Sequence, residues 1–209
     1  MTVSLFENGS LVNTSVIPIG GEYVTNDIAI GLKTQSEVAE QIKIKHGCAL
    51  IEEALEDETF SVPRIGSNEH KEYNQVDLAH IIEPRLAEMF ELVQKEIRKM
   101  GYQEVPGGYV LTGGVTAMPG IQELAQSVLQ NAVRIAAPEY IGVREPHYTA
   151  AVGLIRYAFQ NLRQAEKEVA ASTQSQGKLR LVGESNHQGQ QGTKQSVREK
   201  VKSWFREFI

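Results

Sequence analysis

The chain has 209 residues, of which 41% are hydrophobic and 22% charged, and its formal net charge at pH 7 is −5. This composition is typical of a globular protein with one or two domains and a core of ordinary size. The single cysteine excludes an internal disulfide and a cysteine metal cluster. No run of about 18 apolar residues is present, which excludes a membrane-spanning helix, and the acidic balance argues against nucleic-acid binding.

The first quarter of the chain predicts a hairpin followed by two helices. An Asn-Gly pair at 8–9 separates two apolar, β-branched runs, a pattern that favours a two-residue hairpin turn. A helix is expected over 23–32. A second helix is expected to begin with a capping box formed by Thr34 and Glu37, and to end at Gly47.

The next segment predicts one short strand and one long helix. The best strand covers 60–62 and ends at a proline, and residues 66–74 are expected to form an exposed loop. Apolar residues then recur at spacings of three and four over 75–100, which predicts an amphipathic helix. Pro84 lies inside this helix and predicts a kink or a break near Glu83.

Strands and helices alternate again over 105–163. A strand over 109–112 is followed by two glycines, and a helix is expected from Pro119 to about residue 131. A short strand over 133–136 comes next. An Ala-rich helix over 148–162, able to pack closely, completes this part of the chain.

The last part of the sequence has a different character. Residues 1–163 carry 13 Lys and Arg against 21 Asp and Glu, a net of −8, whereas residues 164–209 carry 8 against 5, a net of +3. Residues 164–196 are rich in Gln and Ser and are expected to be a disordered tether. Residues 197–209 predict an amphipathic helix that lies on an anionic membrane, and the alternative is a helix that docks on this chain or on a partner. The membrane-facing residues would be Val197, Val201, Lys202, Trp204, Phe205, Arg206, Phe208 and Ile209.

Catalytic patterns are weak in this sequence. The five histidines are scattered, and Cys48 has no obvious base partner, so neither a catalytic residue nor a metal site is expected. The strand, glycine pair and helix start over 111–121 could let a nucleotide approach the backbone, and a tight structural turn is the alternative. Arg85 follows Pro84 and is either a partner-binding residue or an ordinary surface charge.

Four segments carry a family resemblance, namely residues 2–9, 18–28, 111–121 and the tail over 164–209. The first is similar to the strand after a second phosphate-binding motif, and the third to the adenosine motif of actin-like proteins. Together they resemble the C-terminal half of the FtsA family of actin-like bacterial cell-division proteins. The resemblance implies an α/β, actin-like ATPase fold with a ribonuclease-H-like core. It implies a larger subdomain over 1–31 and 105–163 and a smaller one over 32–104, followed by the tether and the amphipathic helix.

The same resemblance implies two sets of site residues and their ligands. ATP would be the nucleotide, with Lys43 near the adenine or ribose, and whether Mg²⁺ accompanies it is left open. The FtsZ C-terminal peptide would dock beside the segment Glu83-Pro84-Arg85, with Ile82 and Leu86 as apolar contacts and Arg85 as an ion-pair partner. The glycine-rich walls of the nucleotide site would be Gly20, Gly21, Gly113 and Gly114, together with Ala117.

The function implied is that of a membrane-tethered adaptor that anchors FtsZ filaments, the Z ring, at the cytoplasmic face of the cell membrane and supports septum assembly. Family members also self-associate. The chain is expected to lack the N-terminal half with its phosphate loops, so ATP hydrolysis is not expected. The alternatives are a fragment of a sugar-kinase or chaperone ATPase with the same fold, and an actin-like pilus or cell-shape scaffold.

Overall fold

The computed structural model describes residues 1–66 and 69–163. Residues 1–158 form one compact unit, and the second unit, which begins at Phe159, is described only as far as residue 163. The tether predicted over 164–196 and the amphipathic helix predicted over 197–209 lie outside the described residues. Within the described part, no helix combines the length and the apolar character needed to cross a membrane.

The chain opens with the predicted hairpin. Strand β1 (Thr2–Glu7) pairs antiparallel with β2 (Ser10–Val16), and the turn residues Asn8 and Gly9 have φ angles of 50° and 80°. Both angles are positive, which an Asn-Gly pair accepts at little cost and which matches the twist of the strands. The sequence prediction is confirmed here.

Two helices follow, and their positions agree with the prediction except at one cap. Helix α1 runs from Gly21 to Leu32 and α2 from Ser36 to His46. The capping box expected at Thr34 is wrong, because the helix begins after Gln35 and no side chain caps it. The hydroxyl of Thr34 instead donates to the carbonyl oxygen of Pro63 at 2.9 Å, which ties the connection between the helices to a strand.

The segment that follows α2 contains one more strand than the sequence predicted. After a short 3-10 turn, η1 (Ile51–Glu53), strand β3 (Thr59–Pro63) pairs antiparallel with β4 (His70–Asn74). The expected exposed loop is therefore wrong for residues 70–74. The strand was missed because its residues are polar and lack the alternating pattern that identifies most strands.

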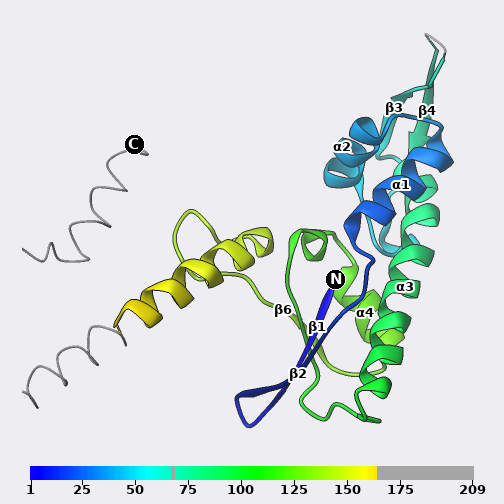
Figure 1. The fold of residues 1–209 in the computed structure, drawn as a ribbon. Helices are drawn as coiled ribbons and strands as arrows, with labels where there is room; N and C mark the ends of the chain where they lie inside the picture. The colour runs from blue at the N-terminus through cyan, green and yellow to red at the C-terminus, as the bar shows by residue number, and fades with distance from the viewer. Residues whose placement is uncertain (67–68, 164–209) are drawn as a thin grey trace, which may run out of the picture. The chain divides into compact units, whose positions relative to one another are not determined.

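Helix α3 (Gln75–Lys99) is a single helix that passes through Pro84 without a break (Figure 1). Its start is fixed by a capping box in which Asn74 and Asp77 exchange side-chain to backbone hydrogen bonds. Residues on both sides of the proline are held by packing, since Ile82 and Leu86 expose only 0% and 1% of their surface. The predicted break does not occur because these contacts outweigh the missing hydrogen bond.

The rest of the compact unit alternates strands and helices. Strand β5 (Tyr109–Leu111) leads into the 3-10 turn η2 (Gly114–Ala117) and helix α4 (Ile121–Leu129). Strand β6 (Val133–Ile135) pairs parallel with β5, and a 3-10 turn, η3 (Pro146–Tyr148), precedes a helix over 149–163. Nearly all side chains of that last helix are exposed, so the described residues do not provide the close packing expected for it.

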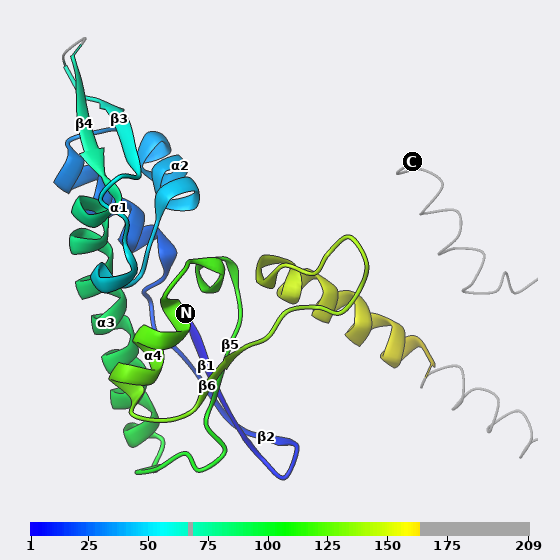
Figure 2. The same ribbon diagram turned by 180° about the vertical axis from the view of Figure 1, so that it is seen from behind.

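Two apolar clusters hold the unit together. The larger one gathers buried side chains from α1, α2, β3, α3 and α4, including the fully buried Val24, Ile28 and Leu78. The smaller one joins Val3 and Leu5 of β1 to Ile17 and to Ile97 near the end of α3. Helix α3 contributes to both clusters and is therefore the common support for the hairpin and the two helices α1 and α2 (Figure 2).

Candidate functional site

The segment that follows β5 packs against the start of α1 and the end of α2. A Cβ atom added to Gly21 would lie 2.5 Å from Cγ2 of Val115, and one added to Gly47 would lie 2.9 Å from Cε of Met118. Glycine at these two positions is what allows η2 to approach both helices so closely. The contact brings the chain segments that hold the predicted nucleotide-site residues next to each other, and within it Lys43 bonds directly to Gly21. The predicted residues are Gly20, Gly21, Lys43, Gly113, Gly114 and Ala117.

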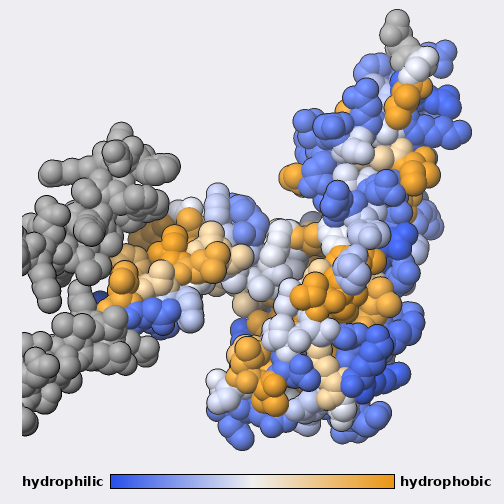
Figure 3. Space-filling view, viewed as in Figure 1, coloured by the Kyte–Doolittle hydropathy of each residue, from blue (hydrophilic) through white to orange (hydrophobic). Residues whose placement is uncertain are grey.

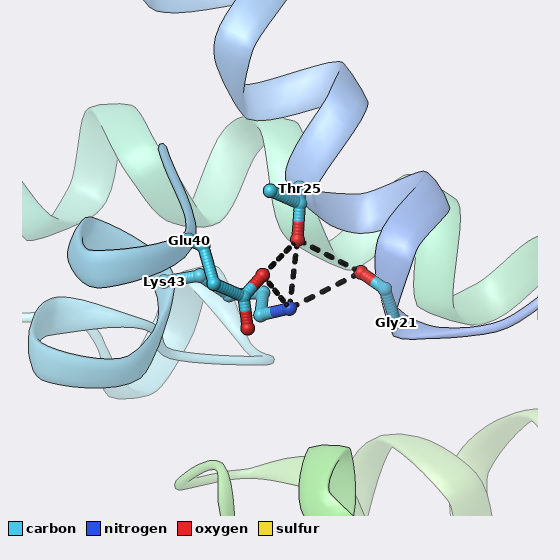
Figure 4. Close-up of polar contacts among 4 residues, drawn as sticks. All are labelled: Gly21, Thr25, Glu40 and Lys43. Carbon is cyan, nitrogen blue, oxygen red and sulfur yellow. Dashed lines mark hydrogen bonds and ion pairs between the residues drawn. The ribbon is translucent and has the colours of Figure 1, made fainter. Parts of the chain in front are cut away.

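Lys43 of α2 is the charged centre of this region (Figure 4). Its side chain is only 9% exposed, and its ammonium donates three hydrogen bonds. The acceptors are the carbonyl oxygen of Gly21 at 3.2 Å, Oγ1 of Thr25 at 2.7 Å and Oε2 of Glu40 at 2.6 Å. All three ammonium protons therefore bind within the protein, and Lys43 holds the first turns of α1 against α2.

Glu40 is the residue of this cluster that faces solvent. Its side chain is 44% exposed, and Oε2 accepts hydrogen bonds from both Lys43 and Thr25. Partial burial opposes ionisation of this carboxyl, but the two hydrogen bonds and the Lys43 charge outweigh it and lower the pKa of Glu40. An ionised, half-exposed carboxylate is a good acceptor for the hydroxyl groups of a ligand.

Neither Glu40 nor Thr25 was identified from the sequence. The available signal was the spacing between Glu40 and Lys43, because residues three apart on a helix lie on the same face. Thr25 carried no signal of its own, since its role depends on the packing of α1 against α2.

The glycines directly before α1 and at the start of η2 leave open space at the backbone. A Cβ atom at Gly20 or Gly113 would meet no atom within 4 Å, and one at Gly114 would meet only Cβ of His147 at 3.7 Å. Gly113 also has a φ angle of 114°, which side chains of L-amino acids rarely adopt. At these glycines a flat or extended group could approach the backbone without meeting a side chain. Among the described residues, no group of three His, Cys, Asp or Glu side chains could hold a metal ion.

At the second predicted site, the guanidinium of Arg85 is already paired with carboxylates of this chain. The guanidinium donates to both carboxylate oxygens of Asp27 on α1, with Nη2 to Oδ1 at 3.2 Å, and also to Glu88 one turn further along α3. The hydrogen bond with Asp27 is the main cause that raises the pKa of Arg85. Arg85 remains 27% exposed.

Its predicted neighbours are mostly occupied within the fold. The side chains of Ile82 and Leu86 lie in the core, so in this conformation they present almost no surface to a peptide. Oε2 of Glu83 accepts a hydrogen bond from the backbone N–H of Ile51 at 2.6 Å. Of the four residues predicted to contact the peptide, Arg85 is therefore the one whose charged group lies at the surface. Among the described residues its guanidinium bonds only to side-chain carboxylates and not to the backbone. The predicted membrane-facing residues, from Val197 to Ile209, lie outside the described residues.

Comparison with known families gives a match over most of the chain. A family model described as "Cell division protein FtsA" matches residues 1–153. The cell division protein FtsA of Bacillus subtilis is 52% identical over 162 residues, which are 78% of this chain and 37% of the relative. The FtsA proteins of Pseudomonas aeruginosa and Escherichia coli K12 are 38% and 37% identical over 97% and 81% of this chain, and over 47% and 43% of their own length. The chain thus spans less than half the length of these relatives.

Solved structures show the same fold at low sequence identity. MreB5 of Spiroplasma citri bound to ADP aligns with a TM-score of 0.61 at 14% identity, over 79% of this chain and 52% of that protein. The same protein bound to AMPPNP aligns with a TM-score of 0.62 at 15% identity, over 80% of this chain and 52% of that protein. The mixed α/β fold is therefore that of the actin-like proteins, as the sequence predicted.

Proposed function

Because the chain belongs to the FtsA family of cell-division proteins, we propose that it acts as a membrane-tethered adaptor that holds FtsZ filaments at the cytoplasmic face of the cell membrane. The observation that carries this proposal is the family match over residues 1–153. The relatives support a role in cell division. The membrane, the FtsZ peptide and the nucleotide are each proposed from particular residues.

The membrane contact is proposed for residues 197–209. In a helix, Val197, Val201, Trp204 and Phe208 would share one face, with Lys and Arg on the other. Such a helix lies in the headgroup region with its rings at the boundary of the acyl chains, and its basic residues favour anionic lipid.

The peptide contact is proposed for Arg85. An acidic peptide would compete with Asp27 and Glu88 for the guanidinium, and Glu88 is the easier partner to displace because its side chain is 53% exposed. The Asp27 pair holds Arg85 in position through both carboxylate oxygens. The apolar part of the peptide would have to use neighbours other than Ile82 and Leu86, since both are buried.

The nucleotide contact is proposed for the cluster around Lys43. The adenosine of ATP would lie against the open backbone of Gly20 and Gly113, and the carboxylate of Glu40 would accept hydrogen bonds from the ribose hydroxyls. Lys43 would position Glu40 rather than carry the ligand, because its three protons are already used. We expect binding without hydrolysis, since the sequence carries no glycine-rich phosphate loop.

The membrane and peptide contacts are tested together by co-sedimentation of the full chain with vesicles rich in anionic phospholipid, in the presence of a labelled FtsZ C-terminal peptide. Trp204→Glu should weaken vesicle binding about tenfold, because a buried indole is lost and a charge is added. Ser203→Glu is the matched control, since it adds the same charge on the opposite face of the helix. Equal binding by the two variants would show that residues 197–209 do not contact lipid through this face.

The peptide contact has its own matched pair on α3. Arg85→Glu should release the labelled peptide without changing vesicle binding, whereas Lys95→Glu makes the same charge change on the same helix and should leave the peptide bound. Lys95 is an exposed residue with a weak 4.0 Å pair to Glu91. If both variants retain the peptide, Arg85 is not its ion-pair partner.

A further inference from the structure

The turn of the β1–β2 hairpin contains the only Asn-Gly pair of the sequence. Asn8 and Gly9 are both exposed. Within the described part of the chain, the side chain of Asn8 and the N–H of Gly9 form no hydrogen bond. The side-chain amide of Asn8 and the peptide nitrogen that follows it are therefore accessible to solvent and are not held by a partner.

These two groups can react with each other in water. The peptide nitrogen of Gly9 attacks Cγ of Asn8 and forms a new N–C bond, while the Cγ–Nδ2 bond breaks. The peptide proton passes through water to the leaving nitrogen, which departs as ammonia. The resulting five-membered succinimide then takes up one water molecule at either of its carbonyl groups and opens to aspartate or isoaspartate. Glycine favours the attack because it has no Cβ to shield the nitrogen.

The closed turn prevents this attack. Asn8 has a φ angle of 50°, which places it in the left-handed region. In that region Cβ of Asn8 and the nitrogen of Gly9 lie on nearly opposite sides of the Cα–C bond, so Cγ cannot reach the nitrogen. The peptide group between the two residues has to rotate before the ring can close, and such a rotation opens the turn.

The hairpin tip, residues 6–12, has little support from the rest of the fold. All of its residues are exposed, whereas Val3 and Leu5 anchor the hairpin nearer its base. A shift of register between Leu5 and Phe6 leaves the tip with two strand pairs of its own. The tip projects away from α3 (Figures 1 and 2), and Figure 3 shows the apolar surface over the hairpin. A segment with so few buried contacts opens locally at a low cost in free energy.

One hydrogen bond restrains the tip from outside the hairpin. The hydroxyl of Tyr102, in the loop after α3, donates to Oε1 of Glu7 at 2.7 Å. Tyr102 packs partly buried on the smaller apolar cluster, so it connects the tip to the core. Among the described residues, no other hydrogen bond joins residues 6–12 to an element outside the hairpin. Removal of the Tyr102 hydroxyl should therefore ease opening without changing the reacting groups.

We propose that Asn8 is a deamidation site of the folded chain and that opening of the hairpin tip sets the rate of its conversion. Each event adds one negative charge next to Glu7. Where the product is isoaspartate, the main chain gains one methylene group, which a two-residue turn does not accommodate, so the pairs on either side cannot re-form in register. The modification is a slow, one-way opening of the tip. It does not depend on membrane, peptide or nucleotide binding.

The test is incubation of the full chain at mildly alkaline pH, followed by peptide mapping with mass spectrometry and labelling with an isoaspartyl methyltransferase. Conversion of Asn8 should occur in the folded chain, but about tenfold or more slowly than in the same chain unfolded in guanidinium, because only the open tip reacts. Asn13 is the internal control. It is exposed on the same hairpin and is followed by Thr14, whose side chain shields the nitrogen, so it should remain unchanged.

A matched pair of variants tests the restraint. Tyr102→Phe should accelerate conversion in the folded chain about fivefold and leave the rate in guanidinium unchanged, since it removes one hydrogen bond. Glu7→Ala removes the same bond from the other side and should act in the same direction, relative to its own rate in guanidinium. Tyr23→Phe is the control, because the hydroxyl of Tyr23 is bonded to no described residue, and it should not change the rate.

Three results would overturn the proposal. The first is an Asn8 that stays intact in the folded chain while it converts in guanidinium. The second is an equal rate in the folded and the unfolded chain, which would mean that the turn gives no protection. The third is a Tyr102→Phe rate no higher than that of Tyr23→Phe, which would show that release of the tip does not control the reaction.

Discussion

The two residues of the Glu40–Lys43 ion pair should contribute unequally to the free energy of unfolding. Removing the carboxylate of Glu40, the exposed partner, should cost more stability than removing the ammonium of Lys43, the buried partner. Lys43 is 9% exposed, whereas Glu40 is 44% exposed. Glu40→Gln leaves an ammonium group in a mostly buried position without its counter-charge. Lys43→Met leaves a carboxylate that can turn to water, and the methionine side chain refills the space beside α1.

The magnitude follows from this exposure. Breaking a fully buried pair costs roughly 3–5 kcal/mol, and an exposed pair is worth about 0.2–1 kcal/mol. Glu40 lies between these limits, so we expect Glu40→Gln to lower the free energy of unfolding by about 2 kcal/mol. Lys43→Met should cost about 1 kcal/mol, mainly for hydrogen bonds lost at Gly21 and Thr25.

Urea unfolding of the full chain, followed by circular dichroism, measures both values. Lys45→Met is the matched control, because Lys45 is exposed on the same helix and forms no ion pair among the described residues. Its effect should stay within about 0.5 kcal/mol. The reasoning is refuted if Lys43→Met is the more destabilising change, or if Glu40→Gln has no more effect than the control. The first result would mean that the hydrogen bonds dominate and the charge contributes little.

Three further predictions concern the same unit. Gly21→Ala should destabilise it by about 1–3 kcal/mol because the new Cβ would overlap Val115, and Val115→Ala should restore much of the loss in thermal denaturation. Asn74→Ala should cost about 1 kcal/mol in urea unfolding, since it removes half of the capping box of α3. The pKa of Glu40 is lowered from 4.5, so the stability gained from its ionised form is present above that pH and is lost as the pH falls through the folded-state pKa. The difference between the wild type and Glu40→Gln should therefore shrink below about pH 4.5 and stay constant from pH 6 to 7.

Features set by local chemistry could be predicted from this sequence. The Asn-Gly turn at 8–9 requires two positive φ angles, and the apolar period of α3 requires a buried face, so both were correct at the level of single residues. The end of α2 at Gly47 was also found, and the local reason is that a Cβ atom there would lie 2.3 Å from the carbonyl oxygen of Lys43. In each case the deciding interaction lies within a few residues of the chain.

Features set by distant contacts could not be predicted. Thr34 has the sequence signature of a helix cap, but its hydroxyl is used by Pro63, which lies far along the chain. Strand β4 is polar and exists because β3 lies beside it. The continuity of α3 at Pro84 depends on packing of Ile82 and Leu86 against other helices, and the period of the helix alone does not contain that information.

Some residues of the candidate sites could likewise be found from local spacing, whereas others are brought together only by the fold. The spacing of the glycines in 111–121 identified a segment, but only the fold brings Val115 against Gly21 and so places η2 beside α1. Glu40 lies one turn before Lys43 and could have been found by helix spacing. The pairing of Arg85 with Asp27 could not, because it joins residues 58 positions apart.

Helix α1 connects the two proposed sites, and this limits how independently they can act. Thr25 binds Lys43 of α2, and Asp27 binds Arg85 of α3. Residues two apart on a helix point to nearly opposite sides, so α1 is held from both sides within a single turn. A ligand that shifts Lys43 therefore pulls on the helix that positions Arg85, and a peptide that displaces Asp27 acts in the reverse direction. Because variants with shared partners are not additive, measurements at Glu40 and Arg85 need a double-mutant cycle before either site is assigned its own energy.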